Sequence, residues 1–96
     1  MAAYCIFDIL RVKDAAAMEC YRTHVLATID RYGGRFLAIG GPCELIEGNV
    51  KPTFPIVIEF PSLRQAHLWY DSADYRDLKA LRLAAVDSNA VFIQGL

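Results

Sequence analysis

Two segments of the chain have the length and residue types of β-strands, in which successive side chains point to opposite faces, yet both faces of each segment are largely apolar. In residues 4–12, one face carries Tyr4, Ile6, Asp8, Leu10 and Val12, and the other carries Cys5, Phe7, Ile9 and Arg11. In residues 54–60, Phe54, Ile56, Ile58 and Phe60 alternate with Pro55, Val57 and Glu59. A strand with two apolar faces has to be covered on both sides. The fold therefore needs a sheet that is covered on each face.

Three helices are predicted from N-cap residues and from apolar residues at three- and four-residue spacing. The predicted N-caps are Asp14, Ser62 and Ser72, and the helices are expected to end near Tyr32, Tyr70 and Val86. Gly33 and Gly34 follow the first helix, where glycine commonly supplies the left-handed residue that ends a helix. These segments alternate with the strands along the chain.

Further strands are expected at residues 35–39 and 91–94, with a turn at 87–89 before the last one. Residues 43–46 are expected to form a short strand or hairpin arm. The order is then β-α-β-β-α-β, with the second helical unit split into two pieces. This order indicates an α+β, ferredoxin-like fold with a four-stranded antiparallel sheet. A length of 96 residues suits a single domain that spans residues 1–96.

The ferredoxin-like order places helices on one face of the sheet only, so the other face needs a cover. A second copy of the same sheet is the natural one, which would form a dimeric α/β barrel across a two-fold axis. The composition agrees, because 55% of the residues are hydrophobic in a chain small enough to leave much of its surface exposed. The alternative is a dense core in which alanine-rich helices raise the hydrophobic count. We favour the homodimer.

Charge and cysteine content exclude several classes of function. Ten basic and eleven acidic residues are scattered along the chain, which argues against a nucleic-acid partner and against adsorption to a membrane. No apolar stretch approaches the roughly 20 residues of a membrane-spanning helix. Three widely spaced cysteines, Cys5, Cys20 and Cys43, are read as reduced thiols of a cytoplasmic protein.

Glu59 and His24 are the candidates for acid–base chemistry. Glu59 interrupts a face that should be covered, where an ionised carboxylate is costly unless it is paired. An ion pair with Arg35 or Arg82 is the structural explanation, and a functional acid or base is the alternative. His24 lies at the edge of the first helix's apolar stripe, so it is either a helix-flank residue or a proton-transfer group. Asp8 raises the same question as Glu59 on the first strand.

Several aromatic and basic residues could line a cleft over the sheet. The candidates for ligand binding are Tyr21, Arg35, Trp69, Tyr70 and Arg82. Aromatic side chains at helical spacing are more often core, but buried tyrosine hydroxyls need partners and an arginine can hold a carboxylate. No metal-ligand spacing and no phosphate-binding glycine motif is present, so neither a metal nor a cofactor is expected.

A set of motifs along nearly the whole chain resembles the DUF1330 family of the dimeric α/β-barrel superfamily. They are Tyr32-Gly33-Gly34-Arg35-Phe36-Leu37, Gly40-Gly41, Glu47-Gly48, Pro52, Glu59-Phe60-Pro61-Ser62, Ala66, Trp69-Tyr70, Ser72, Tyr75 and Arg82. The resemblance implies a homodimer with a possible small-molecule pocket between helices and sheet, by analogy of fold. Ile39 departs from the pattern, because many similar chains carry a basic residue there.

Two functional hypotheses follow. The first is a cytoplasmic homodimer that binds a small organic molecule between helices and sheet. If that protein is catalytic, cofactor-independent proton transfer or oxygenation is the expected reaction type, with His24 or Glu59 as the acid or base. The second is a non-catalytic dimeric binding or accessory module, whose polar residues serve folding.

Overall fold

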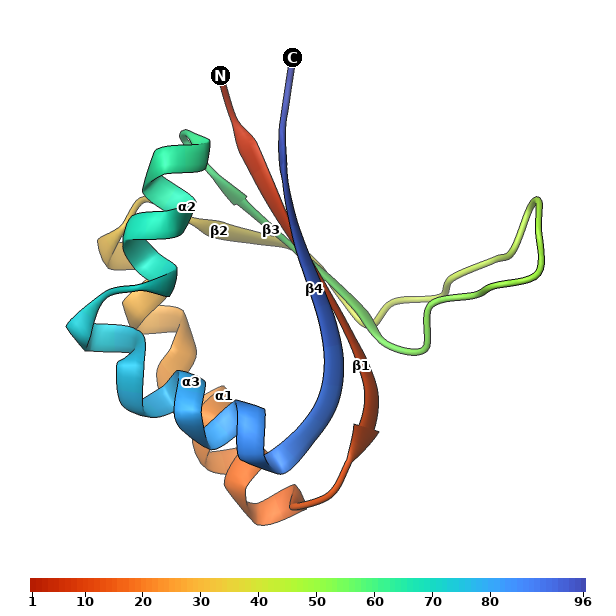
Figure 1. The fold of residues 1–96 in the computed structure, drawn as a ribbon, viewed down its shortest axis with the longest axis horizontal. Helices are drawn as coiled ribbons and strands as arrows, with labels where there is room; N and C mark the ends of the chain where they lie inside the picture. Colours follow the sequence, from red (N-terminus) through yellow and green to blue (C-terminus); the bar gives the residue numbers. More distant parts are fainter.

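The computed structural model describes all 96 residues and has the predicted ferredoxin-like fold (Figure 1). The elements are β1 (Ala3–Val12), α1 (Ala15–Arg31), β2 (Arg35–Ile39), β3 (Pro55–Phe60), α2 (Leu63–Tyr70), α3 (Ala73–Ala85) and β4 (Val86–Gln94). The four strands form one antiparallel sheet in the order β2-β3-β1-β4. All three helices lie on one side of this sheet.

The register of the sheet separates a helix-facing side from an open face. Cys5 of β1 lies opposite Ile58 of β3 and Phe92 of β4, and these side chains turn toward the helices. Directly opposed residues share a face, so the neighbouring positions point away from the helices. The open face is made by Tyr4, Ile6, Val57, Val91 and Ile93 with the polar Asp8 and Glu59. Both faces of β1 are therefore apolar, as the sequence predicted.

The helix ends follow from the capping residues. Oδ1 of Asp14 accepts a hydrogen bond from the amide of Ala17 at 3.0 Å, and the hydroxyls of Ser62 and Ser72 cap α2 and α3 in the same way. Gly33 has φ of +78°, the left-handed conformation that ends α1. The three predicted N-caps are thus confirmed.

The turn predicted at residues 87–89 is wrong, because β4 begins at Val86 and continues through these polar residues. Helix α3 passes directly into the strand, and Val86 pairs with Val12 at the far end of β1. Asp87 lies opposite Arg11 and forms an exposed ion pair with it at 3.4 Å. Cross-strand pairing with a long β1 thus overrides the local turn preference of the sequence.

The short strand predicted at residues 43–46 is also wrong. Residues 40–54 form a long connection, here called the arm, which projects from the body on the side away from the helices (Figure 1). The base of the arm is fixed by Oδ1 of Asp8, which accepts hydrogen bonds from the amides of Thr53 and Phe54 at 2.9 and 2.8 Å. Beyond that base the arm has no neighbouring strand to pair with.

The core lies between the sheet and the helices and is organised around Trp69. This side chain is fully buried, and its ring packs against those of Phe60 and Tyr75 with centroids 5.4 and 4.2 Å apart. Its indole N–H donates a hydrogen bond to Oγ1 of Thr28 at 3.0 Å. Thr28 in turn donates to the carbonyl of Val25 at 2.7 Å, so every polar atom in this contact has a partner.

Replacing Thr28 with Val should therefore destabilise the fold although the side-chain volume hardly changes. Thr28→Val leaves the indole N–H of Trp69 buried without an acceptor, which costs about 1–3 kcal/mol of unfolding free energy. Thr23→Val is the matched control on α1, because the exposed Thr23 hydroxyl bonds only to the carbonyl of Glu19. We expect a change within about 0.5 kcal/mol there in urea denaturation. Equal losses in both variants would contradict the assignment.

Candidate functional site

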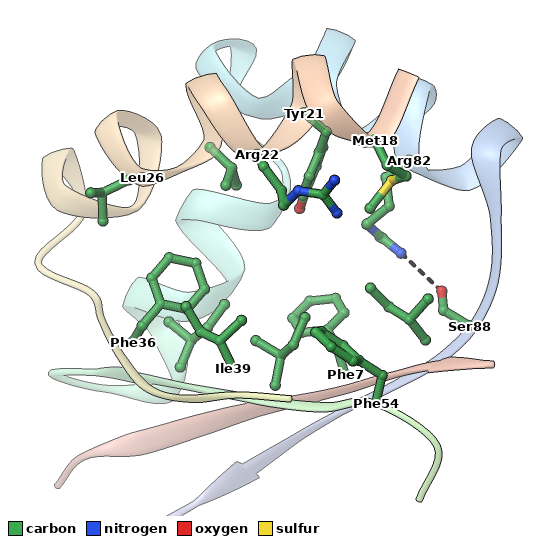
Figure 2. A pocket seen from close by; sticks show the side chains of 14 residues that line it. Phe7, Met18, Tyr21, Arg22, Leu26, Phe36, Ile39, Phe54, Arg82 and Ser88 are labelled. Carbon is green, nitrogen blue, oxygen red and sulfur yellow. Dashed lines mark hydrogen bonds between the residues drawn. The ribbon is translucent and has the colours of Figure 1, made fainter. Parts of the chain in front are cut away.

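A cavity of about 300 Å³ lies between α1 and the helix-facing side of the sheet (Figure 2). Helix α1 packs mainly along α3, and few of its backbone positions come close to the strands, so a gap remains beneath it. Of the 14 residues around the gap, 11 are hydrophobic. Phe7, Val25, Phe36, Ile56 and Ile58 form much of the wall. The cavity is therefore an apolar space that the core side chains leave unfilled.

Arg82 of α3 is the only charged side chain among the buried residues, and it borders this cavity. Its exposed fraction is 3%, and its guanidinium lies over the ring of Phe7 at 5.1 Å. Nε donates a hydrogen bond to the hydroxyl of Tyr75 at 3.2 Å, and Nη1 donates to the hydroxyl of Ser88 at 3.1 Å. No carboxylate forms an ion pair with Arg82. The cation is held by neutral groups alone.

Tyr21 and Tyr75 extend the hydrogen-bond chain that begins at Arg82. Their hydroxyl oxygens lie 2.7 Å apart, and Tyr21 of α1 borders the cavity. Burial raises the pKa of both phenols above their ordinary value, so both are neutral near pH 7. The polar part of the site is thus one guanidinium and three neutral hydroxyls.

Half-exposed side chains mark the mouth of the cavity, on the flank of α1. Leu26 and Ile39 are 51% and 57% exposed, and Phe54 lies beside them at the base of the arm. Gly40 has φ of +57°, and a Cβ there would collide with the ring of Phe54. Arg22 borders the same opening, paired with Glu19 at 2.8 Å on the helix surface. The mouth is apolar with one exposed cation.

The structure brings two of the predicted ligand-binding residues, Tyr21 and Arg82, to one cavity. Two others, Trp69 and Tyr70, do not line it. Trp69 is fully buried in the core, and its indole N–H is already bonded to Thr28. Tyr70 is half-buried, and Nζ of Lys79 lies 4.2 Å from the centre of its ring. These two aromatic residues therefore belong to the core and its edge, which was the alternative to ligand binding.

Arg35 and Glu59 pair with each other away from the cavity. Nε of Arg35 lies 2.7 Å from Oε1 of Glu59, across the β2–β3 ladder, so the ion-pair explanation of Glu59 holds. Asp8 shares the open face with Glu59. The residue of β1 opposite Glu59 is Tyr4, however, and Asp8 lies four positions further along that strand. These carboxylates do not meet.

His24 is exposed on α1, and its Nδ1 lies 2.9 Å from the carbonyl oxygen of Cys20. Neither His24 nor Glu59 borders the cavity. An acid or base role for them therefore has no support from the geometry. No three His, Cys, Asp or Glu side chains come together in the arrangement that a metal ion needs.

The sequence model of a family described as "Domain of unknown function (DUF1330)" matches residues 2–96. The chain belongs to the DUF1330 family. This confirms the resemblance carried by the glycine and aromatic motifs. A comparison with curated protein sequences finds no match.

Solved structures similar to this DUF1330 chain share its fold at low sequence identity. The RPA0582 protein of unknown function from Rhodopseudomonas palustris is 20% identical, with a TM-score of 0.77 over 99% of this chain and 82% of that one. A dimeric ferredoxin-like protein of unknown function from Thermobifida fusca is 21% identical, with a TM-score of 0.65 over 99% and 92%. SnoaB, a cofactor-independent oxygenase from Streptomyces nogalater, is 12% identical, with a TM-score of 0.60 over 99% and 91%.

Sequence reasoning missed Ser88, Met18 and Arg22 as residues of the cavity in this DUF1330 chain. The sequence predicts a turn at Ser88, and only the early start of β4 brings this residue opposite Ile9 and within hydrogen-bond distance of Arg82. Met18 is a buried apolar residue of α1, and nothing in its residue type shows that it borders a gap. Arg22 follows Tyr21 on the same helix, which is the one signal that could have pointed to it.

The buried phenols and the Cys5 thiol predict a loss of stability in alkali. Burial raises the pKa of Tyr21 and Tyr75 and raises that of Cys5 from 9.0 to about 12. A raised pKa means that the folded state holds these protons more tightly than the unfolded chain. The stabilisation is complete below the unfolded pKa values and is lost as the pH rises through them toward the folded values.

We therefore expect the free energy of unfolding, measured by urea denaturation, to fall steadily above about pH 9, by roughly 1.4 kcal/mol per pH unit for each group that titrates. Tyr21→Phe should make this decline shallower. Tyr32→Phe is the control, because the Tyr32 hydroxyl lies at the surface, where it donates to Oδ2 of Asp74 at 3.1 Å. A stability that stays constant from pH 8 to pH 11 would contradict the account.

Proposed function

We propose that this protein binds a small, mostly apolar organic molecule in the cavity between α1 and the sheet, and that it does so as a homodimer. The observation that carries the proposal is a preformed apolar cavity with a few convergent polar groups at one place on its wall. Sites of this kind, from about 300 Å³ upward, are the usual form of a small-molecule pocket. The apolar walls would contribute affinity, and the polar groups would orient the ligand.

Binding is the function that the geometry supports better than catalysis by the chain's own acid or base. The residues around the cavity include no carboxylate, imidazole or thiol, so no group there can accept a proton near pH 7. Cofactor-independent oxygenation, the activity of SnoaB, is a second candidate. The cavity has no base, so the substrate would have to enter it already deprotonated. Hydrogen-bond donors on the buried wall would then stabilise the negative charge on its oxygen.

The open face of the sheet supports the homodimer. Ile6, Val91 and Ile93 lie side by side there and are 36%, 58% and 56% exposed. An exposed apolar patch on a strand surface favours association, and a second copy of the same patch is its matching cover. The dimeric Thermobifida fusca protein has the same fold, which agrees with this arrangement.

The arm supports the same assembly. Ile46 and Val50 are 82% and 80% exposed on it, and it projects on the side of the open face (Figure 1). In a dimer that pairs the two open faces, each arm would pass alongside the other subunit and bury these side chains. The exposed apolar residues of the arm and of the sheet would then share one function.

Filling the cavity should weaken ligand binding without unfolding the protein. Ile56 points into the cavity from β3, so Ile56→Trp places a bulky ring inside it. We expect the neutral fluorescent probe N-phenylnaphthylamine to bind the natural protein, and its Kd to rise at least about tenfold in the variant. Leu83→Trp on the exposed side of α3 is the control. Probe binding that is equally strong in Ile56→Trp would contradict the proposed pocket.

A charge on the open face should separate the subunits. Val91→Glu would bury a carboxylate against the partner's apolar surface, and we expect the dimer Kd to rise by at least about 100-fold. Sedimentation equilibrium should give twice the chain mass of 10.7 kDa for the natural protein and a single chain mass for the variant. Leu83→Glu, at a position with a similar exposed fraction on α3, is the control. A natural protein that sediments as a monomer would refute the homodimer.

A further inference from the structure

Arg82 is a buried cation whose charge nothing in the chain neutralises. The other charged side chains that make close ion pairs do so with one another, and none of those pairs includes Arg82. A guanidinium stays protonated even when it is buried, so it cannot escape this cost by losing its proton. Proteins rarely keep a charge in an apolar interior without a partner of the opposite sign. Arg82 belongs to α3, and the open face lies on the side of the sheet away from the helices (Figure 1).

The hydrogen-bond chain at Arg82 leads through Tyr75 to Tyr21 on the cavity wall. Tyr75 is fully buried and its oxygen accepts from Nε of Arg82, so its own proton needs an acceptor. The hydroxyl oxygen of Tyr21 is the only one within hydrogen-bond distance. Either hydroxyl of this pair can be the donor. When Tyr75 donates, its own proton has an acceptor and the hydroxyl proton of Tyr21 is free for a group in the cavity.

The guanidinium leaves donors free as well. Nε and Nη1 bond to Tyr75 and Ser88, whereas Nη2 bonds to nothing in the chain. No fully buried side-chain nitrogen lacks a partner, so Nη2 reaches accessible space, and the cavity is the space that Arg82 borders. Figure 2 shows Arg82 and Tyr21 reaching from the two helices toward the same region above Phe7. This wall offers hydrogen-bond donors and a positive charge.

We propose that the ligand of this cavity is an apolar monocarboxylic acid, bound as its anion with the carboxylate at Arg82 and Tyr21. The inference rests on the proposed function and names the class of ligand. An ionised carboxylate has only acceptors, which matches the free guanidinium donor of Arg82 and a neighbouring hydroxyl that can turn its proton toward the ligand. One buried cation balances one negative charge, so a phosphate dianion would be left half neutralised. The apolar walls fit the rest of such an acid.

Matched acid and amide probes test the class of ligand. Phenylbutyrate and phenylbutyramide have nearly the same shape, and each is titrated against bound N-phenylnaphthylamine to obtain its Kd. We expect the acid to bind the natural protein at least about tenfold more tightly than the amide. In Arg82→Met this preference should disappear, while the Kd of the amide changes less than about threefold. Arg76→Met, an exposed arginine on the same helix, should keep the preference.

Two further experiments test where in the cavity the anion binds. A contact with the exposed Arg22 would be screened in about 1 M salt, whereas a contact with the buried Arg82 would persist. If Arg22→Met loses the preference for the acid and Arg82→Met keeps it, the anion binds at the mouth of the cavity. That result would overturn the assignment. If Arg82→Met does not fold, Tyr21→Phe replaces it. That variant should weaken the acid at least about threefold more than the amide, and an equal change in both would refute the proposal.

The failures of the two proposals are distinguishable. If the fluorescent probe binds the natural protein and the amide displaces it as well as the acid does, the pocket stands and the carboxylate inference fails. If the probe does not bind the natural protein, the proposed function itself fails. Tighter binding of the acid than of the amide, with this preference lost in Arg82→Met, supports both.

Discussion

The constraint on which the structure depends is a sheet that receives helices on one side only. Three helices share the limited width of that side, and α1 packs along α3 instead of lying flat on the strands. That arrangement leaves the space beneath α1 that becomes the cavity. The same one-sidedness exposes Ile6, Val91 and Ile93 on the other face. The pocket and the apolar open face are thus two consequences of one topology.

Local signals in the sequence predicted the parts of the fold that depend on local physics. The N-caps at Asp14, Ser62 and Ser72 place the starts of the helices, because their side-chain oxygens satisfy amides only three residues away. Residues 87–89 show where such signals fail. Their polar side chains favour a turn, but pairing along the full length of β1 makes them a strand, and that pairing is a property of the whole sheet.

The candidate site could be predicted only in part, for the same reason. The sequence identified Tyr21 and Arg82 as residues that could face a cleft, because a buried tyrosine hydroxyl needs a partner and an arginine can hold a carboxylate. It could not distinguish them from Trp69, which has the same periodicity and is closed in by the core. Nor could it show that Glu59 takes Arg35 rather than Arg82, since that choice is set by the β2–β3 register. The isolation of Arg82 is visible only in three dimensions.

The isolation of Arg82 also explains why the surrounding residues are of the types observed. A cation facing an apolar cavity without a counter-ion tends to attract water or to be expelled. Neutral hydroxyls on two sides and the ring of Phe7 below lower this cost without neutralising the charge. A carboxylate among these residues would stabilise the empty fold more, but it would also satisfy the cation internally. Arg82 would then have no reason to prefer an anion in the cavity. Hydroxyl partners without an acidic neighbour therefore let the protein bury Arg82 and leave its charge available to an anion in the cavity.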